Sequence, residues 1–254
     1  MEHETILANL HLHAVMPNMA KVAVYDPVAR EITAGWKGTV QFAVLGGPAV
    51  HLVFDNGKAT AEREKVTWPT LGFTFATCAQ ANKMFTGKGI AIPMVWGLWH
   101  PMMLKGFLKL SKRLEFYLKP GPQTVSDPTN KKFIVELMLN TIVNGIAILA
   151  RLDHHAIQLG QTSPRGSVEF RVLPNGPVMN LVHMGDGKFT AAEGPAVKAS
   201  AVMEFKDVDT AWGVFNNELD AMILMGLGDI RIRGLVPLVD NVSGIMDILS
   251  RYLA

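Results

Sequence analysis

The sequence predicts an α+β protein of two tandem domains, each a mainly antiparallel sheet with helices packed against it. The first observation behind this prediction is a phrase that occurs twice: GPAVHLVFDNGKAT begins at Gly47, and GPVMNLVHMGDGKFT begins at Gly176. The copies lie about half the chain length apart, as a tandem duplication requires. The second observation is strand-like alternation around each phrase, and the third is an amphipathic helix ending in Tyr-Leu in each half. We expect a divergent first domain at 1–119, a linker at 120–130 and a second domain at 131–254.

Segments 37–60 and 165–190 each predict three strands joined by turns. In the first strand of each segment, valine and phenylalanine occupy every second position, which is the period of a strand with one buried face. A Gly-Gly-Pro or Asn-Gly-Pro sequence supplies one turn. Asn-Gly at 56–57 and Asp-Gly at 186–187 supply the next, because these residues tolerate positive φ. Each half therefore begins its sheet with an antiparallel meander.

A fourth strand and a short helix follow the meander in both halves. The strand is expected at 73–75 in the first half and at 201–205 in the second, and the helical segments AQANKMF and VDTAWGVF come next. A basic residue and a glycine precede the terminal helix, whose apolar residues step by three and four. These residues are Phe107, Leu110, Leu114 and Tyr117 in the first half, and Leu238, Val242, Ile245, Leu249 and Tyr252 in the second.

A further helix is expected to open each half. Segment 133–160 predicts a long helix in which Glu136, Asn140 and Asn144 recur at every fourth position and form a narrow wet face. This stripe argues against a membrane span, which needs about 20 mostly apolar residues. The first half has a weaker counterpart, ETILANLHLHAVM, which Pro17 is expected to cut short.

Composition places the chain among soluble globular proteins. Of its 254 residues, 49% are hydrophobic and 18% are charged. The net charge of +2 is too small for the basic field that nucleic-acid binding uses. Cys78 is the single cysteine, which excludes an intrachain disulfide. The N-terminal residues carry acids where a secretory signal carries Lys or Arg, so we expect a cytoplasmic protein.

The repeated unit resembles the type-2 sterol carrier protein family. The resemblance is clearest in NNELDAMILMGLGDIRIRGLVPLVDNVSGIMDIL, where segment 228–234 is similar to the family's strand of the Gly-x-Ile-x-Ile-x-Gly sort. The match covers most of 165–253 and, more loosely, 36–118. It implies two tandem copies of a five-stranded sheet that is covered by helices around an apolar tunnel.

The resemblance also implies a function, which is the non-catalytic binding and transfer of a hydrophobic ligand. Fatty acids, fatty acyl-CoA, sterols and phospholipids are the expected ligands, and no cofactor is implied. An apolar guest gains about 25 cal/mol per Å² of surface removed from water, and flexible methionines repack around different guests. The expected ligand-binding residues in the second copy are Met203, Phe205, Phe215, Met222, Met225, Ile230, Ile232, Leu238, Val242 and Met246. Those in the first copy are Phe73, Phe75, Met84, Phe85, Trp96, Trp99 and Phe107.

The first copy departs from the family's pattern near its last strand. Its sequence IPMVWGLWHPMMLKG contains Pro93 and Pro101, so we expect a short or displaced strand, because proline cannot donate to a central ladder. The two tryptophans beside a basic amphipathic helix are typical of transient contact with an anionic membrane surface. The alternatives left open are a cap over a cavity, packing against the other copy, and a solvated basic face.

The sequence contains no credible catalytic constellation and no pattern of metal ligands. It lacks a Gly-x-Ser-x-Gly elbow, and GDGK at 185–188 lacks the spacing of a phosphate-binding loop. The histidines have no cysteine partners, so we expect neither an enzyme nor a metal site. Two alternatives to a lipid carrier stay open. One is an interaction or dimerisation module with filled cavities, and the other is an enzyme acting on a lipid or acyl thioester.

Overall fold

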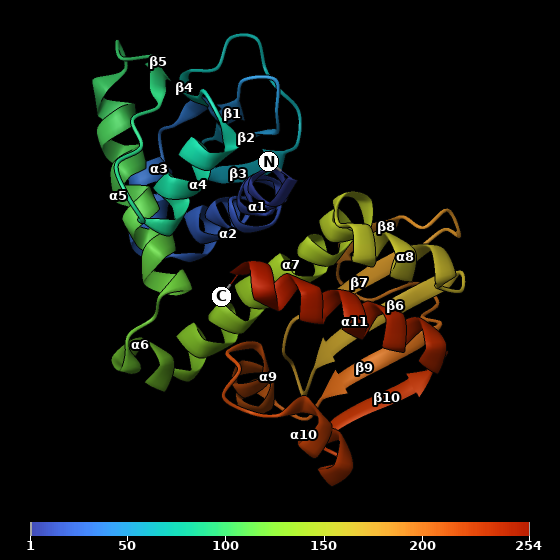
Figure 1. Ribbon diagram of the computed structural model, residues 1–254. Helices are drawn as coiled ribbons and strands as arrows, with labels where there is room; N and C mark the ends of the chain where they lie inside the picture. Colours follow the sequence, from blue (N-terminus) through green and yellow to red (C-terminus); the bar gives the residue numbers. More distant parts are fainter. Residues whose placement is uncertain (1, 254) are drawn as a thin grey trace. The chain divides into compact units, whose positions relative to one another are not determined.

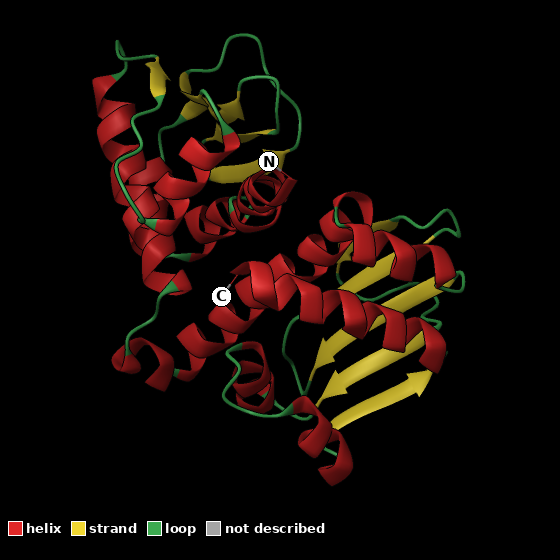
Figure 2. Cartoon of the chain, viewed as in Figure 1, coloured by secondary structure: helices red, strands yellow, loops and turns green. Residues whose placement is uncertain are grey.

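The structure, a computed structural model, describes residues 2–253 and divides into two compact units. Unit 1 covers Met1–Lys119 and unit 2 covers Pro120–Ala254. Each unit has one five-stranded sheet and its own set of helices (Figure 2). The predicted α+β fold with two sheets is therefore confirmed.

Unit 1 consists of a helical N-terminal segment, the sheet, and a long terminal helix. Its helices are α1 (Glu2–Leu10), the π-helical turn η1 (His11–Val15), α2 (Asn18–Tyr25), α3 (Pro27–Thr33), α4 (Cys78–Thr86) and α5 (Pro101–Leu118). Its strands are β1 (Lys37–Val44), β2 (Ala49–Asp55), β3 (Lys58–Glu62), β4 (Leu71–Phe75) and β5 (Met94–Trp96). The strand order is β3-β2-β1-β4-β5.

Unit 2 repeats this plan (Figure 1). Its helices are α6 (Pro122–Ser126), α7 (Pro128–Leu152), α8 (His154–Thr162), α9 (Val208–Phe215), α10 (Ala221–Leu227) and α11 (Val236–Leu253). Its strands are β6 (Gly166–Val172), β7 (Val178–His183), β8 (Phe189–Glu193), β9 (Ala201–Phe205) and β10 (Ile230–Gly234). The strand order is β10-β9-β6-β7-β8, which is the unit 1 order read from the other end.

The two sheets also share their pairing pattern. The central strands β1 and β6 pair antiparallel with the next strand of the meander and parallel with the fourth strand of their unit. All other pairings are antiparallel. The predicted Asn-Gly turn joins β2 to β3, with both residues at positive φ (Asn56 +48°, Gly57 +83°).

A pair of hydroxyl groups ties the start of the central strand to the fourth strand in both units. The Thr39 N–H donates to Thr70 Oγ1 (3.1 Å), and the Thr70 N–H donates to Thr39 Oγ1 (3.2 Å). Ser167 and Ser200 form the same reciprocal pair at 3.2 and 3.4 Å. The duplication therefore extends to specific side-chain contacts.

A second duplicated contact joins the terminal helix to the start of an early helix. Tyr117 of α5 donates to Asp26, the N-cap of α3, and Tyr252 of α11 donates to Asp153, the N-cap of α8; both O···O distances are 2.9 Å. These contacts make α3 equivalent to α8 and α5 equivalent to α11. They also fix the alignment of the two terminal helices.

Several local features differ from the sequence-based expectations. The segment expected to be a linker, 120–130, contains α6 and the start of α7, because Asp127 caps α7 through the N–H groups of Thr129 and Asn130. The long helix expected at 133–160 breaks at Asp153, which caps α8. Pro17 does not end the helical segment of unit 1, because it occupies the N-cap position of α2, where no intrahelical donor is required.

Helix α7 is the core helix of unit 2. It is long and apolar enough to cross a membrane by length and composition, but 72% of its most apolar window is buried inside the protein. It packs against α8, α9, α11, β7 and β8. The polar stripe of Glu136, Asn140 and Asn144 was expected to face solvent, but Asn140 is buried. The side-chain oxygen of Asn140 accepts a hydrogen bond from Asn144 (3.0 Å).

Candidate functional site

The apolar face of the unit 2 sheet is formed by rows of residues that are partners across neighbouring strands. One row runs from β7 to β10 through Met179, Phe170, Met203 and Ile232. The first three are buried and Ile232 is half-buried. Cα partners project to the same face of a sheet, so the predicted ligand-binding residues Met203 and Ile232 lie side by side.

Helices α9 and α11 bring further apolar side chains to this face. The ring of Phe215, at the end of α9, lies 5.2 Å from the ring of Phe205 on β9. Helix α11 packs against β6, β9 and β10, and it carries the buried Val242 and, one turn later, the half-buried Met246. Partial exposure of Phe215, Ile232 and Met246 means that solvent reaches part of this apolar site.

The same region of unit 1 is filled by aromatic rings that pack on one another. Phe42 of β1 lies 4.9 Å from Phe73 of β4 and 5.6 Å from Phe107 of α5, between ring centroids. Phe73 and Phe107 are themselves 5.6 Å apart, and Phe85 of α4 lies 6.1 Å from Phe42. Phe42, Phe73 and Phe107 are buried, so two of the predicted lining residues of the first copy, Phe73 and Phe107, pack on each other and on Phe42.

Equivalent positions in unit 2 carry smaller or more flexible side chains. Phe73 pairs with Phe42 in the same parallel ladder in which Met203 pairs with Phe170. Phe107 lies the same number of residues before Tyr117 as Val242 lies before Tyr252, the tyrosine of the equivalent helix. Two phenylalanines of the unit 1 cluster are therefore replaced by methionine and valine.

Helix α10 exposes an unusual amount of apolar surface. Met222, Ile223 and Leu227 are 74%, 63% and 70% exposed, and only Leu224 of this helix is buried. Asp220 caps the helix, and Gly228 ends it in the left-handed conformation (φ +80°). The helix packs on β10, which is an edge strand of the sheet (Figure 1). Exposed apolar patches of this kind mark interaction sites.

The predicted ligand-binding residues fall into three groups by exposure. Eight are buried: Phe73, Phe75, Phe107, Met203, Phe205, Ile230, Leu238 and Val242. Six are half-buried: Met84, Phe85, Phe215, Met225, Ile232 and Met246. Three are exposed: Trp96, Trp99 and Met222. Trp96 pairs with Gly72, the neighbour of Phe73, so it lies on the opposite face of the sheet from the aromatic cluster.

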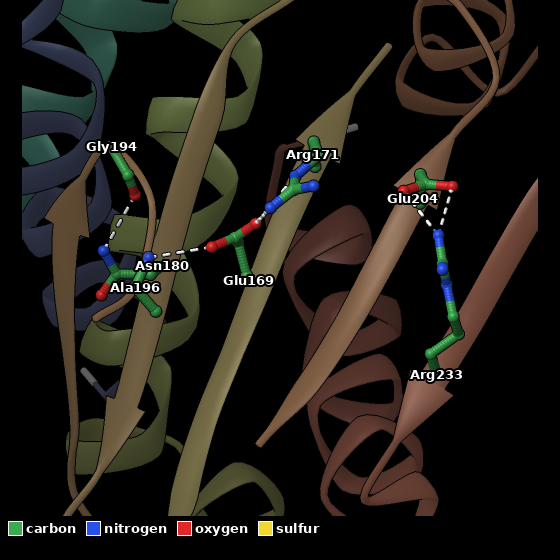
Figure 3. Close-up of polar contacts among 7 residues, drawn as sticks. All are labelled: Glu169, Arg171, Asn180, Gly194, Ala196, Glu204 and Arg233. Atoms are coloured by element: carbon green, nitrogen blue, oxygen red, sulfur yellow. Dashed lines mark hydrogen bonds and ion pairs between the residues drawn. The ribbon is translucent and has the colours of Figure 1, made fainter. Parts of the chain in front are cut away.

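The outer face of the unit 2 sheet carries a row of charged and polar side chains (Figure 3). Glu169 is 2% exposed and accepts hydrogen bonds from Arg171 Nε (2.9 Å) and from the Ala196 N–H (2.8 Å). Buried Glu204 is held by Arg233, with Nη2 2.8 Å from both carboxylate oxygens. Arg233 therefore points away from the apolar face.

Segment 194–200 folds over part of this outer face. Asn180 Nδ2 donates to the Gly194 carbonyl (3.0 Å), and the Ala196 N–H bonds to Glu169, so both polar residues are covered. A cavity of about 530 Å³ lies at this segment, with Ser167, Asn180, His183 and Lys198 among its lining residues. Sequence reasoning missed this polar face, because alternation marks only which residues are apolar.

No metal site emerges from the histidines and acids that the structure describes: among residues 2–253, no three such side chains or cysteines are grouped to hold an ion. Buried His11 instead bonds through Nδ1 to Asn82 Oδ1 (3.0 Å), and Asn82 Nδ2 donates to Glu4 Oε2 (2.6 Å). Burial lowers the pKa of His11, which outweighs the hydrogen bond to Asn82. The neutral imidazole thus holds η1 against α4.

Similarity to known proteins is found among solved structures. No protein-family model matches the sequence, and no curated protein matches it significantly. The UbiJ-SCP2 ubiquinone synthesis protein is 14% identical, with a TM-score of 0.33 over 42% of this chain and 95% of that one. The sterol carrier protein domain 2 of Helicoverpa armigera is 14% identical, with a TM-score of 0.36 over 45% of this chain and 89% of that one. The chain resembles the type-2 sterol carrier proteins.

A possible sterol carrier protein from Thermus thermophilus is similar as well, at 17% identity and a TM-score of 0.33 over 44% of this chain and 85% of that one. Each likeness covers close to the share of the chain that one unit occupies. At these identities and TM-scores, the likeness concerns the fold of one unit and does not identify a ligand.

Proposed function

We propose that unit 2 binds a hydrophobic molecule between its sheet and helices α9, α10 and α11, and that the chain transfers this molecule without chemical change. A fatty acid, a fatty acyl-CoA, a sterol or a phospholipid is the expected ligand class, in line with the resemblance to sterol carrier proteins. The observation that carries the proposal is the replacement of Phe73 and Phe107 by Met203 and Val242 at equivalent positions.

The physical argument is one of space and adaptability. Unit 1 packs three phenylalanine rings between β1, β4 and α5. In unit 2, two of these rings are replaced by the thioether chain of Met203 and the small branched side chain of Val242. Methionine changes rotamer easily and fits guests of different shape. An apolar guest that displaces water from the half-buried Phe215, Ile232 and Met246 gains about 25 cal/mol per Å² of apolar surface buried.

Helix α10 is the proposed entry. It packs on β10, buries one leucine and keeps three large apolar residues in water. An element with so little buried apolar surface opens at low free-energy cost. A guest that enters beside β10 meets Ile232 first and then Met203 on the next strand.

Unit 1 is proposed to have a different role, because its aromatic cluster occupies the corresponding space. This favours the filled interaction module for unit 1 and one ligand per chain. We also propose that ligand binding is non-covalent and that the protein acts in the cytoplasm, in transient contact with a membrane that donates or receives the ligand.

The test is to transfer the unit 1 residues into unit 2. The double variant Met203→Phe, Val242→Phe is expected to fold, because unit 1 accommodates phenylalanine at both positions. Titration with a fluorescent fatty acid should show saturable binding to the unchanged protein and at least tenfold weaker binding to this variant. The matched control is Leu110→Ile in unit 1, a volume-conserving change outside the site. Unchanged binding by the double variant would refute the site, and no binding by the unchanged protein would refute the carrier function.

A further inference from the structure

Unit 1 has an exposed apolar surface centred on three tryptophans, Trp68, Trp96 and Trp99. The ring centroids of Trp68 and Trp96 are 5.8 Å apart, and those of Trp96 and Trp99 are 4.8 Å apart. Their exposed fractions are 77%, 44% and 62%. Leu98 (60% exposed) and Met102 (82% exposed) lie in the same segment as Trp96 and Trp99. We call these five residues the tryptophan surface.

The backbone fixes this surface in place. Trp96 pairs with Gly72 across β4 and β5, and a side chain on Gly72 would meet the Cβ of Trp96 at 3.3 Å. Gly97 follows with φ +87°, and a Cβ there would lie 2.0 Å from the Thr70 carbonyl. The chain thus passes too close to β4 for any other residue, and this turn presents Trp96 and Trp99 together. The backbone of the fold therefore determines the exposed positions of these two rings.

A cationic hollow adjoins the tryptophan surface. It has a volume of about 630 Å³, and Trp99 and Met102 belong both to its lining and to the tryptophan surface. Lys37, Lys105 and Lys109 also line it, and all three are exposed. Among the described residues that line the hollow, none is acidic. The hollow therefore attracts anions.

We infer that this face of unit 1 docks on an anionic lipid bilayer, with the tryptophan surface in the headgroup region and lipid phosphates at the three lysines. Tryptophan prefers the boundary between headgroups and hydrocarbon, because its ring is apolar and its N–H is polar. Basic residues beside an apolar face add attraction to anionic lipid. A second copy of the chain fits this face poorly, because it would bring three more lysines against these three. The inference rests on the proposed lipid carriage, because it names the surface at which the ligand is exchanged.

The experiment is vesicle flotation of the full chain without added ligand. Vesicles of phosphatidylcholine alone are compared with vesicles that also contain phosphatidylserine. The variants are Trp96→Ala, Trp99→Ala and, separately, Lys105→Glu, Lys109→Glu. The control is Lys58→Glu, Lys132→Glu, which makes the same change of net charge at exposed lysines outside the hollow.

We expect binding to the phosphatidylserine vesicles that weakens with added salt and is at least tenfold weaker in both test variants. The control should bind within about twofold of the unchanged protein. Equal binding by test and control variants, or equal binding to both kinds of vesicle, would overturn the inference. Association of the chain with itself through this face, lost in the tryptophan variant, would also overturn it.

Fluorescent fatty-acid binding by the same variants separates this inference from the proposed function. Both test variants should bind the fatty acid in solution as the unchanged protein does, because the altered residues belong to unit 1. Loss of vesicle binding with fatty-acid binding retained supports the docking face. An unchanged protein that binds vesicles but no fatty acid contradicts the carrier function and leaves the docking face standing.

Discussion

The hydroxyl of Tyr117 donates to a carboxylate oxygen of Asp26 at 2.9 Å, between the terminal helix of unit 1 and the N-cap of α3. Arg113, one turn before Tyr117, binds the same carboxylate with Nε at 3.1 Å and Nη2 at 2.5 Å. Burial alone would raise the pKa of Asp26, but hydrogen bonds from Arg113, the Ala29 N–H and Tyr117 outweigh it, so the pKa lies below its usual value. Burial raises the pKa of Tyr117 to about 12, so the phenol remains a donor at neutral pH.

Removing the charge of Asp26 should destabilise unit 1 markedly. Asp26→Asn leaves the partly buried Arg113 without its counter-ion, and we expect a loss of about 3 kcal/mol in the free energy of unfolding. Four of the five tryptophans lie in unit 1, so denaturation followed by tryptophan fluorescence reports mainly on this unit. The matched change Asp153→Asn is in unit 2, at a half-buried position where asparagine still caps the helix; its denaturation, followed by far-UV circular dichroism, should show a loss of less than about 1 kcal/mol. Equal losses would contradict this account.

Unit 1 should lose stability as the pH falls below about 6.5. Burial lowers the pKa of both His11 and His13, so the unfolded chain takes up protons at a pH where the folded unit does not. The contribution of the two histidines to stability is therefore fully present above their pKa in the unfolded chain. It declines as the pH falls toward their lower pKa values in the folded unit. A second decline is expected below about pH 4, where Asp26 acts in the same direction. Melting temperatures between pH 7.5 and 5 check the first step, and a flat profile would show that these histidines are not held neutral.

A methyl group at Gly38 should be poorly tolerated. Gly38 has φ +152°, and a Cβ there would lie 2.3 Å from Thr70 Oγ1, inside the reciprocal hydroxyl pair. Gly166 has φ +153°, and a Cβ there would lie 2.7 Å from Ser200 Oγ. We expect Gly38→Ala and Gly166→Ala each to cost about 1–3 kcal/mol. The control is Gly35→Ala, because a Cβ at Gly35 would have no neighbouring atom within 4 Å. In chemical denaturation this variant should have nearly the free energy of unfolding of the unchanged protein.

Unit 1 should acquire a ligand site when its aromatic cluster is reduced to the unit 2 residues. Phe73→Met, Phe107→Val removes two buried rings and is expected to cost about 2 kcal/mol or more. The same variant should bind a second equivalent of fluorescent fatty acid, counted by titration to saturation. A stoichiometry that stays at one would mean that the identity of these two residues does not decide which unit binds.

Most of the sheet could be predicted from the sequence, because alternation and turn dipeptides are local signals. The Asn-Gly turn at Asn56 fixed the register of β2 and β3, and the prolines at 93 and 101 indicated the short β5. The break at Asp153 was missed, because an unbroken apolar period outweighed a single capping residue. That capping signal was present in the sequence, since Asp153 immediately precedes the first turn of α8.

The site was harder to predict than the fold, because it depends on contacts between distant segments. Burial of Glu169 requires segment 194–200 to fold back over the sheet, which no local pattern indicates. Placing Trp96 required the register of β5 on β4, since a shift of one residue moves a side chain to the other face. The equivalence of Phe107 and Val242 became clear only when the Asp–Tyr contacts had aligned the two terminal helices.

The most direct test of the central claim, that unit 2 alone carries one hydrophobic ligand, is native mass spectrometry of the purified chain, followed by organic extraction. We predict one co-purifying lipid or acyl-CoA per chain, which is absent from the Met203→Phe, Val242→Phe variant. A guest that persists in that variant, two guests per chain, or an empty protein that also takes up no fluorescent fatty acid would contradict the account.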